Sequence, residues 1–244
     1  MATSSRALFL HGAGAWGGQW AIWRRVFEAE GWQVDTPDFA PAADGIAATR
    51  FDDYVRQAAE WLAAPVDLLV GASLGGLVAA AATVRMAPAI RPRALVLVNP
   101  IPPAPWVASL PPFVAPGEAD VVPWCSQGRF ASTQSALPEA GFADQQQSFR
   151  RWRDESAAVL REAHAGRCIV AAGVPTLVIA SDADDEIPAA VSAAYAQGIV
   201  ASFCRVPGGH VAPVMGASAA PSAEAALAWL TPRRSMLERR LAAR

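Results

Sequence analysis

The sequence contains no lysine, and this absence excludes every mechanism that needs a lysine side chain. All 20 basic residues are arginines. Cysteine is also scarce and occurs only as Cys125, Cys168 and Cys204. An odd number of cysteines without C-x-x-C spacing argues against a disulfide framework and against a zinc site. We therefore expect reduced, mostly buried thiols and no bound metal.

Long apolar runs and a marked net charge are missing as well. No run approaches the roughly 20 apolar residues of a membrane-spanning helix. The beginning, "MATSSRALFLHG", lacks the apolar region of a secretory signal. The formal net charge of −2 provides no positive field that could hold nucleic acid. We expect a cytoplasmic protein with neither a membrane nor nucleic acid among its partners.

Apolar residues are abundant and fall into short runs. They make up 53% of the 244 residues, against 17% charged residues, which is typical of a single domain with a packed core. Aliphatic runs alternate with helix-patterned stretches and are themselves continuous, as in strands covered by helices on both faces. We predict an α/β fold with a doubly wound, mostly parallel sheet. Its strands are expected near residues 6–10, 32–38, 66–73, 94–100, 176–182 and 201–206.

The region from residue 101 to residue 165 breaks this alternation. It contains no convincing strand, opens in the proline-rich "NPIPPAPW" and is rich in aromatic residues. Structureless loops of this length are uncommon in compact domains. We interpret 101–165 as a helical cap inserted into a core formed by residues 1–100 and 166–244. Its aromatic residues either line an apolar substrate pocket or form the core of the cap itself; the pocket candidates are Trp106, Trp124, Phe130 and Trp152.

The chain ends in the basic stretch "TPRRSMLERRLAAR". We expect this stretch to form a helix that is solvated or contacts a second copy of the chain. A monomer and a homodimer therefore both stay open.

The stretch "LLVGASLGG" carries the first signal for chemistry, because a strand-like run breaks into small residues around Ser73. Gly71 and Gly75 flank this serine and complete the pattern G-x-S-x-G between a predicted strand and a predicted helix. A serine held on so sharp a turn presses against its neighbours, and glycine has no Cβ atom to clash. The pattern predicts that Ser73 is a nucleophile. A tight strand-to-helix turn with an incidental serine is the alternative.

A serine nucleophile needs a base, and the base needs a carboxylate that orients it. In hydrolases with this serine turn the chain order is serine, acid, histidine. Of the three histidines only His210, in "VPGGH" after the last predicted strand, follows a suitable acid. We expect the acid in "SDADDEIP", where Asp184 is the first choice and Asp182 the second. The strand that ends at Asn99 offers no carboxylate.

Two backbone N–H groups are expected to stabilise the negative charge that develops on the substrate oxygen. The N–H of Leu74 lies at a predicted helix start, where the helix dipole favours negative charge. The glycine-rich "HGAG" after the first strand supplies a second N–H, which we assign to Ala13. Gly12, Gly14 and Gly17 also match the G-x-G-x-x-G pattern of dinucleotide-binding proteins. A dinucleotide-dependent reductase is therefore an alternative, but it would leave "GASLGG" and "PGGH" unexplained.

Together, "HGAG", "GASLGG", "SDADDEIP" and "PGGH" make the chain similar to the α/β-hydrolase superfamily over nearly its whole length. "HGAGAWGGQW" resembles the branch of small esterases, plant-type methylesterases and hydroxynitrile lyases. The resemblance implies a triad of Ser73, His210 and Asp184, with Asp184 four positions before Pro188 as in the family's acid loop. Ser181 stands where that loop usually has glycine. Hydroxynitrile lyases of this branch use a lysine, so its absence argues against that activity.

We therefore expect a serine hydrolase that cleaves a small, largely apolar carboxylic ester through an acyl-enzyme and needs no cofactor. Its activity should fall below about pH 6, where an ordinary histidine becomes protonated. A thioester, a lactone or the C–C bond of a β-diketone could be cleaved by the same groups. A non-catalytic ligand-binding protein on the same scaffold is the alternative from another class.

Overall fold

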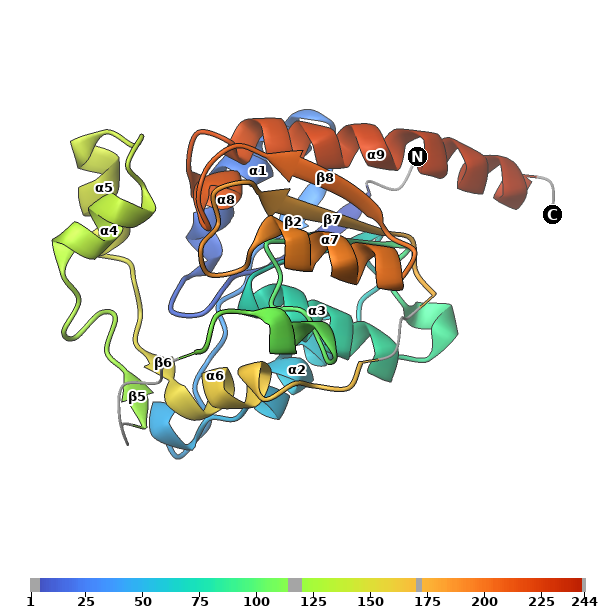
Figure 1. The fold of residues 1–244 in the computed structure, drawn as a ribbon. Helices are drawn as coiled ribbons and strands as arrows, with labels where there is room; N and C mark the ends of the chain where they lie inside the picture. Colours follow the sequence, from blue (N-terminus) through green and yellow to red (C-terminus); the bar gives the residue numbers. More distant parts are fainter. Residues whose placement is uncertain (1–4, 114–119, 170–172, 243–244) are drawn as a thin grey trace.

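The centre of the molecule is a six-stranded sheet in which every neighbouring pair of strands is parallel (Figure 1). This computed structural model describes residues 5–113, 120–169 and 173–242. The strand order is β2-β1-β3-β4-β7-β8. The strands are β1 (Arg6–Leu10), β2 (Gln33–Asp35), β3 (Leu68–Ala72), β4 (Ala94–Val98), β7 (Thr176–Ser181) and β8 (Ser202–Val206). The predicted α/β class and parallel sheet are confirmed.

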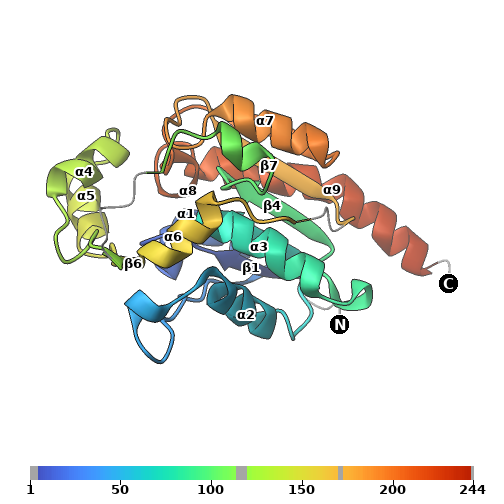
Figure 2. The same ribbon diagram turned by 60° about the horizontal axis from the view of Figure 1, so that its bottom comes forward.

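Helices cover both faces of this sheet (Figures 1 and 2). One face carries α1 (Ala21–Ala29), α8 (Ala212–Met215) and α9 (Ala219–Ala242). The other carries α2 (Phe51–Trp61), α3 (Leu74–Arg85), α6 (Ala157–His164) and α7 (Ala189–Gly198). Short 3-10 turns occur at η1 (Gly17–Trp20), η2 (Ile46–Ala48), η3 (Pro88–Ile90) and η4 (Trp106–Ser109).

The middle strands β3 and β4 are buried along their whole length, since helices pack on both of their faces. Helix α3 follows β3 directly and is buried on nearly all sides, as its uniformly apolar composition predicts. Small residues allow it to lie close to the sheet: a Cβ atom on Gly75 would lie 2.6 Å from the carbonyl oxygen of Leu10 in β1. The turn between β3 and α3 therefore lies at the carboxyl edge near the middle of the sheet, where parallel sheets bind ligands.

The chain leaves the sheet after β4 and returns to it at β7. This stretch contains β5 (Val121–Val122), α4 (Phe130–Ala136), α5 (Phe142–Phe149) and β6 (Glu155–Ser156) before α6. Helices α4 and α5 stand apart from the sheet, at the left of Figure 1. β5 and β6 pair in antiparallel fashion, so the expectation that this region lacks strands is wrong. Two-residue strands are too short to show any periodicity. The boundaries of the cap at residues 101 and 165 stay a prediction.

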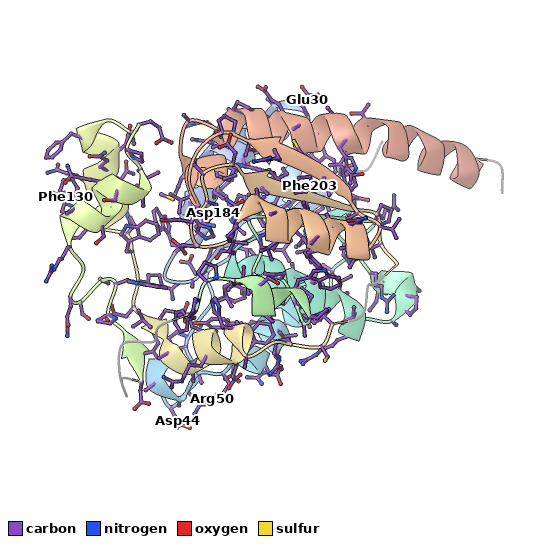
Figure 3. The ribbon with its side chains drawn as sticks, viewed as in Figure 1. Glu30, Asp44, Arg50, Phe130, Asp184 and Phe203 are labelled. Atoms are coloured by element: carbon purple, nitrogen blue, oxygen red, sulfur yellow. The ribbon has the colours of Figure 1, made fainter. Side chains whose placement is uncertain are left out.

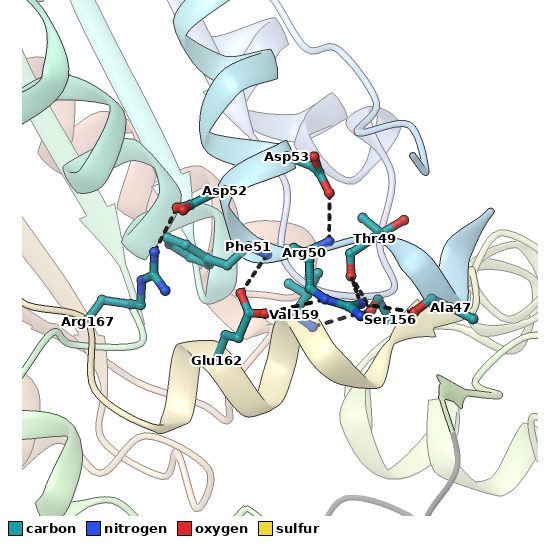
Figure 4. Close-up of polar contacts among 10 residues, drawn as sticks. All are labelled: Ala47, Thr49, Arg50, Phe51, Asp52, Asp53, Ser156, Val159, Glu162 and Arg167. Atoms are coloured by element: carbon teal, nitrogen blue, oxygen red, sulfur yellow. Dashed lines mark hydrogen bonds and ion pairs between the residues drawn. The ribbon is translucent and has the colours of Figure 1, made fainter. Parts of the chain in front are cut away.

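Where the chain returns toward the sheet, hydrogen bonds join α6 and the residue before it to the start of α2 (Figure 4). Glu162 Oε2 accepts a hydrogen bond from the Phe51 N–H at 3.1 Å. Ser156 Oγ donates to the Thr49 carbonyl at 2.8 Å and accepts from the Val159 N–H at 3.3 Å, which caps α6. The end of the insertion thus belongs to the helix layer on that face.

The three cysteines are free, and Cys125 and Cys168 are exposed. This corrects the expectation of mostly buried thiols; both residues lie in loops outside the apolar clusters. Among the helices that the structure describes, none has the length and apolar character needed to span a membrane.

Candidate active site

The turn between β3 and α3 holds Ser73 in a backbone conformation that L residues rarely adopt, with φ 52° and ψ −121°. Glycine is required on both sides of it. A Cβ atom on Gly71 would lie 2.3 Å from the Gly75 carbonyl oxygen, and one on Gly75 would lie 2.3 Å from the His11 carbonyl oxygen. Ser73 lines a large cavity between the sheet and the insertion. Strain at such a position is typical of functional sites.

His210 and Asp184 form a hydrogen-bonded pair beyond the carboxyl ends of β7 and β8. His210 Nδ1 lies 2.7 Å from Asp184 Oδ2, and the Asp184 side chain is fully buried. Asp184 Oδ1 accepts hydrogen bonds from the N–H groups of Glu186 and Ile187, each at 2.9 Å. A carboxylate oxygen accepts hydrogen bonds, so His210 donates to Asp184 through Nδ1, which leaves Nε2 for proton transfer.

The pKa of His210 reflects opposing influences. Burial by itself would lower it, but the hydrogen bond to Asp184 and the charge of Glu186 outweigh burial and raise the pKa to about 9. Glu186 Oε2 lies 3.9 Å from His210 Nε2 on a largely exposed side chain. The resting imidazole therefore favours its protonated form near neutral pH.

Asp182, the second candidate acid, points to a different partner. Its Oδ1 accepts a hydrogen bond from the Gly208 N–H at 3.1 Å, and the residue is exposed. Asp182 therefore shapes the loop that precedes His210, whereas Asp184 contacts the imidazole itself.

Asn99, at the end of β4, is a residue whose role the sequence reasoning missed. Its side chain is buried, and Nδ2 donates to Ser181 Oγ at 2.9 Å and to the His210 carbonyl at 2.7 Å. Its Oδ1 accepts from the Ser181 N–H at 2.7 Å. Asn99 thus ties β7 and the histidine loop to the end of β4. The sequence feature that could have indicated this role is a single amide side chain directly after the continuous apolar run of β4.

The loop of residues 12–14 after β1 lies beside the serine turn, and it is called here the oxyanion loop because the sequence predicts the Ala13 N–H as an oxyanion donor. Ala13 lines the same cavity as Ser73, and a Cβ atom on Gly12 would lie 3.3 Å from Ser73 Cβ. Leu74 is the first residue of α3, where N–H groups lack intrahelical partners and the dipole favours negative charge. The two predicted N–H donors therefore belong to segments that flank the serine.

His11 supports the oxyanion loop from within the core. Its Nδ1 donates to the Gly12 carbonyl at 2.8 Å, and its Nε2 accepts from the Phe39 N–H at 3.0 Å. Burial lowers the pKa of His11 to about 4, so the ring stays neutral in this tautomer. The peptide group that carries the Ala13 N–H is thereby fixed at its carbonyl end.

A cavity of about 780 Å³ opens above Ser73, between the sheet and the insertion. His210 lines it, as do the predicted pocket residues Trp124 and Trp152. Gln19, which the sequence reasoning did not select, also lines it with a buried side chain, and its Nε2 has no hydrogen-bond partner within the described chain. The cavity therefore combines aromatic walls with a few polar groups, as small-molecule sites do.

Trp106 and Phe130, the other two predicted pocket residues, are not among the described residues that line the cavity. Trp106 packs on Tyr195 of α7, with ring centroids 5.2 Å apart. Phe130 packs on Phe142 and Phe149 within the pair α4 and α5, each at 5.5 Å. Figure 3 shows Phe130 on the outlying helices, far from Asp184 at the strand ends. These two side chains stabilise the core and the insertion, respectively.

Asp35 and Asp38 are the acids near the end of β2 that the alternative of a dinucleotide site would use, and both contact other groups of the chain. Asp35 pairs with Arg6 at 2.7 Å, and Asp38 Oδ1 accepts from the Gly17 N–H at 2.5 Å. Within the residues that the structure describes, no group of three histidine, cysteine or acidic side chains could hold a metal ion.

The sequence profile of the alpha/beta hydrolase family matches residues 7–228. The chain therefore belongs to the alpha/beta hydrolase family, in agreement with its sheet and helix layers. A search of curated protein sequences found no match.

Solved structures similar to this chain include several esterases. Polyneuridine aldehyde esterase gives a TM-score of 0.66 at 14% identity, over 87% of this chain and 94% of that one. A pyrethroid hydrolase from Sphingobium faniae JZ-2 gives 0.65 at 18% identity, over 87% and 92%. A thermophilic esterase from Thermogutta terrifontis gives 0.64 at 20% identity, over 94% and 90%. At these identities the likeness shows the shared fold.

Proposed function

We propose that this chain is a serine hydrolase that cleaves a small, largely apolar carboxylic ester through an acyl-enzyme. The observation that carries the proposal is that a strained Ser73 lines the same cavity as His210, whose imidazole is hydrogen-bonded to the buried Asp184. These are the nucleophile, base and orienting acid of acyl transfer. The esterase names of several structural neighbours are consistent with this reaction class.

In the proposed reaction, Ser73 Oγ attacks the ester carbonyl while His210 Nε2 takes its proton. Asp184 holds the imidazole tautomer and stabilises the imidazolium that forms. The N–H groups of Ala13 and Leu74 stabilise the oxyanion, where losing one donor typically costs about 3–4 kcal/mol. Protonated His210 then gives its proton to the leaving alcohol, and water hydrolyses the acyl-enzyme through the same base.

The cavity supports a substrate with an apolar or aromatic group. Trp124 and Trp152 on its wall favour such a group, and about 780 Å³ leaves space for acyl chains longer than acetyl. A thioester, a lactone or a C–C bond next to a carbonyl would engage the same groups. An ester panel with graded acyl length distinguishes these substrates, as does a matched thioester series.

The first test is turnover of p-nitrophenyl acetate, butyrate and octanoate together with labelling by a fluorophosphonate. We expect hydrolysis well above the rate in buffer, and a single adduct on the peptide that contains Ser73. An adduct elsewhere, or tight ester binding without turnover, would favour a non-catalytic ligand-binding protein.

The pH profile of kcat/KM provides a second test. Only neutral His210 can act as the base, and its pKa of about 9 predicts a rate that falls as the pH drops through about 9. This midpoint lies at higher pH than the value of about 6 expected from the sequence, because that expectation used the pKa of an ordinary histidine.

Glu186→Gln removes a negative charge near His210, so it should move the midpoint to lower pH. Added salt should reduce the difference in midpoint between this variant and wild type. A profile that is flat down to pH 4 would rule out His210 as the base.

A further inference from the structure

The insertion returns to the core beside the oxyanion loop and binds both backbone polar groups of Gly14. The Arg153 N–H donates to the Gly14 carbonyl at 2.7 Å, and the Gly14 N–H donates to Glu155 Oε2 at 3.1 Å. The Trp124 ring covers Gly14, since a Cβ atom there would lie 2.2 Å from the ring. The conformation of this loop therefore depends on the insertion as well as on the sheet.

Glu155 is held firmly at this contact. Its side chain is buried, and its second oxygen, Oε1, accepts hydrogen bonds from the Tyr54 hydroxyl at 2.7 Å and from the Ser156 N–H at 2.8 Å. Three donors thus satisfy a carboxylate that would otherwise be costly to bury. Because Tyr54 belongs to α2, this one carboxylate joins α2, β6 and the oxyanion loop.

The oxyanion loop needs such support because glycine gives it little stiffness of its own. Gly14 has φ +62°, in the left-handed region, and Gly12 also lacks a side chain. Two peptide groups meet at Ala13. The core fixes one through His11 and the Gly12 carbonyl, and the insertion fixes the other through Glu155 and the Gly14 N–H.

We propose that Glu155 is a positioning residue that sets the direction of the Ala13 N–H, so that the seating of the insertion on the core controls stabilisation of the oxyanion. The inference rests on the proposed acyl transfer at Ser73. Glu155 itself touches no reacting atom. Its effect should appear in the transition state more than in substrate binding, since the oxyanion forms only there.

The test compares wild-type protein with Glu155→Gln, an isosteric change whose amide cannot accept from all three donors. We expect kcat for p-nitrophenyl butyrate to fall about 10- to 100-fold with KM nearly unchanged, as for a small misplacement of one oxyanion donor. The Ki of an alkyl trifluoromethyl ketone, whose serine adduct carries an oxyanion, should rise by the same factor as kcat/KM falls. A purely structural role would not link these two quantities.

Glu162→Gln is the matched control. Glu162 also accepts a backbone N–H across the same boundary, from Phe51 (Figure 4), and its polar partners among the described residues are Phe51 and Arg50 rather than the oxyanion loop. The change removes the charge that strengthens this hydrogen bond and pairs with Arg50, so it should lower the melting temperature while leaving kcat and the ketone Ki within about twofold of wild type. Tyr54→Phe serves as a milder variant if Glu155→Gln does not fold. It removes one donor to Glu155 and should lower kcat about fivefold.

The outcomes separate this inference from the proposed function. If wild-type protein neither hydrolyses esters nor labels at Ser73, both fail. If wild-type protein is active while a folded Glu155→Gln keeps its kcat and ketone Ki within about twofold, only the positioning role is overturned. The same holds if Glu162→Gln loses as much activity as Glu155→Gln, or if Tyr54→Phe, tested alone, leaves kcat unchanged.

Discussion

Ser73→Ala is expected to lower kcat for p-nitrophenyl butyrate by about 10⁴- to 10⁶-fold, the size of loss seen when a serine nucleophile is removed from such a triad. The methyl group cannot attack the carbonyl, and no acyl-enzyme can form. Labelling by a fluorophosphonate should disappear. Alanine differs from serine only by the missing hydroxyl and adds no volume at this strained turn. The melting temperature should therefore stay close to that of wild type.

Ser132 offers a matched control for this variant, since it is another serine that lines the cavity. Ser132→Ala should keep both labelling and turnover. Residual activity of Ser73→Ala near the wild-type level, or persistent labelling, would mean that another group carries the reaction.

Asp184→Asn is expected to lower kcat by roughly 10³- to 10⁴-fold. The amide nitrogen of asparagine would face His210 Nδ1, which then has to accept the hydrogen bond. The proton moves to Nε2, so the ring can no longer act as a base toward Ser73. The loss should appear in kcat at saturating ester, with substrate binding little changed.

Asp182→Asn tests the same acid loop without touching the imidazole. Asparagine can still accept from the Gly208 N–H, so activity should stay within about tenfold of wild type. If Asp182→Asn were the more damaging of the two changes, the assignment of Asp184 as the orienting acid would fail.

The sheet could be predicted from the sequence because its strands are continuous apolar runs. β3 and β4 are buried on both faces, so composition alone indicates them. β5 and β6 could not be predicted, because two residues carry no periodicity and depend on the tertiary contacts that bring them together.

The candidate site likewise contains residues that the sequence could predict and residues that it could not. Ser73 and His210 stand in glycine-rich turns with a recognisable spacing, and the order of acid and base limits the remaining choices. Nothing in "RWRDESAAVL" distinguishes Glu155 from a solvated acid, since its partners lie on α2 and on the oxyanion loop. Aromatic content likewise could not separate Trp124 on the cavity wall from Phe130 inside the pair α4 and α5.

The amide of Asn99 disfavours the end of β4 as a place for the acid of the proposed triad. A carboxylate at the end of β4 would have no hydrogen to offer the His210 carbonyl, and two negatively polarised oxygens would face each other in a buried space. Relocating the acid from the loop after β7 to this neighbouring strand end would therefore require rebuilding the backbone around His210, and a one-residue exchange would not suffice. Redesign of this scaffold has to treat the two strand ends as chemically unequal.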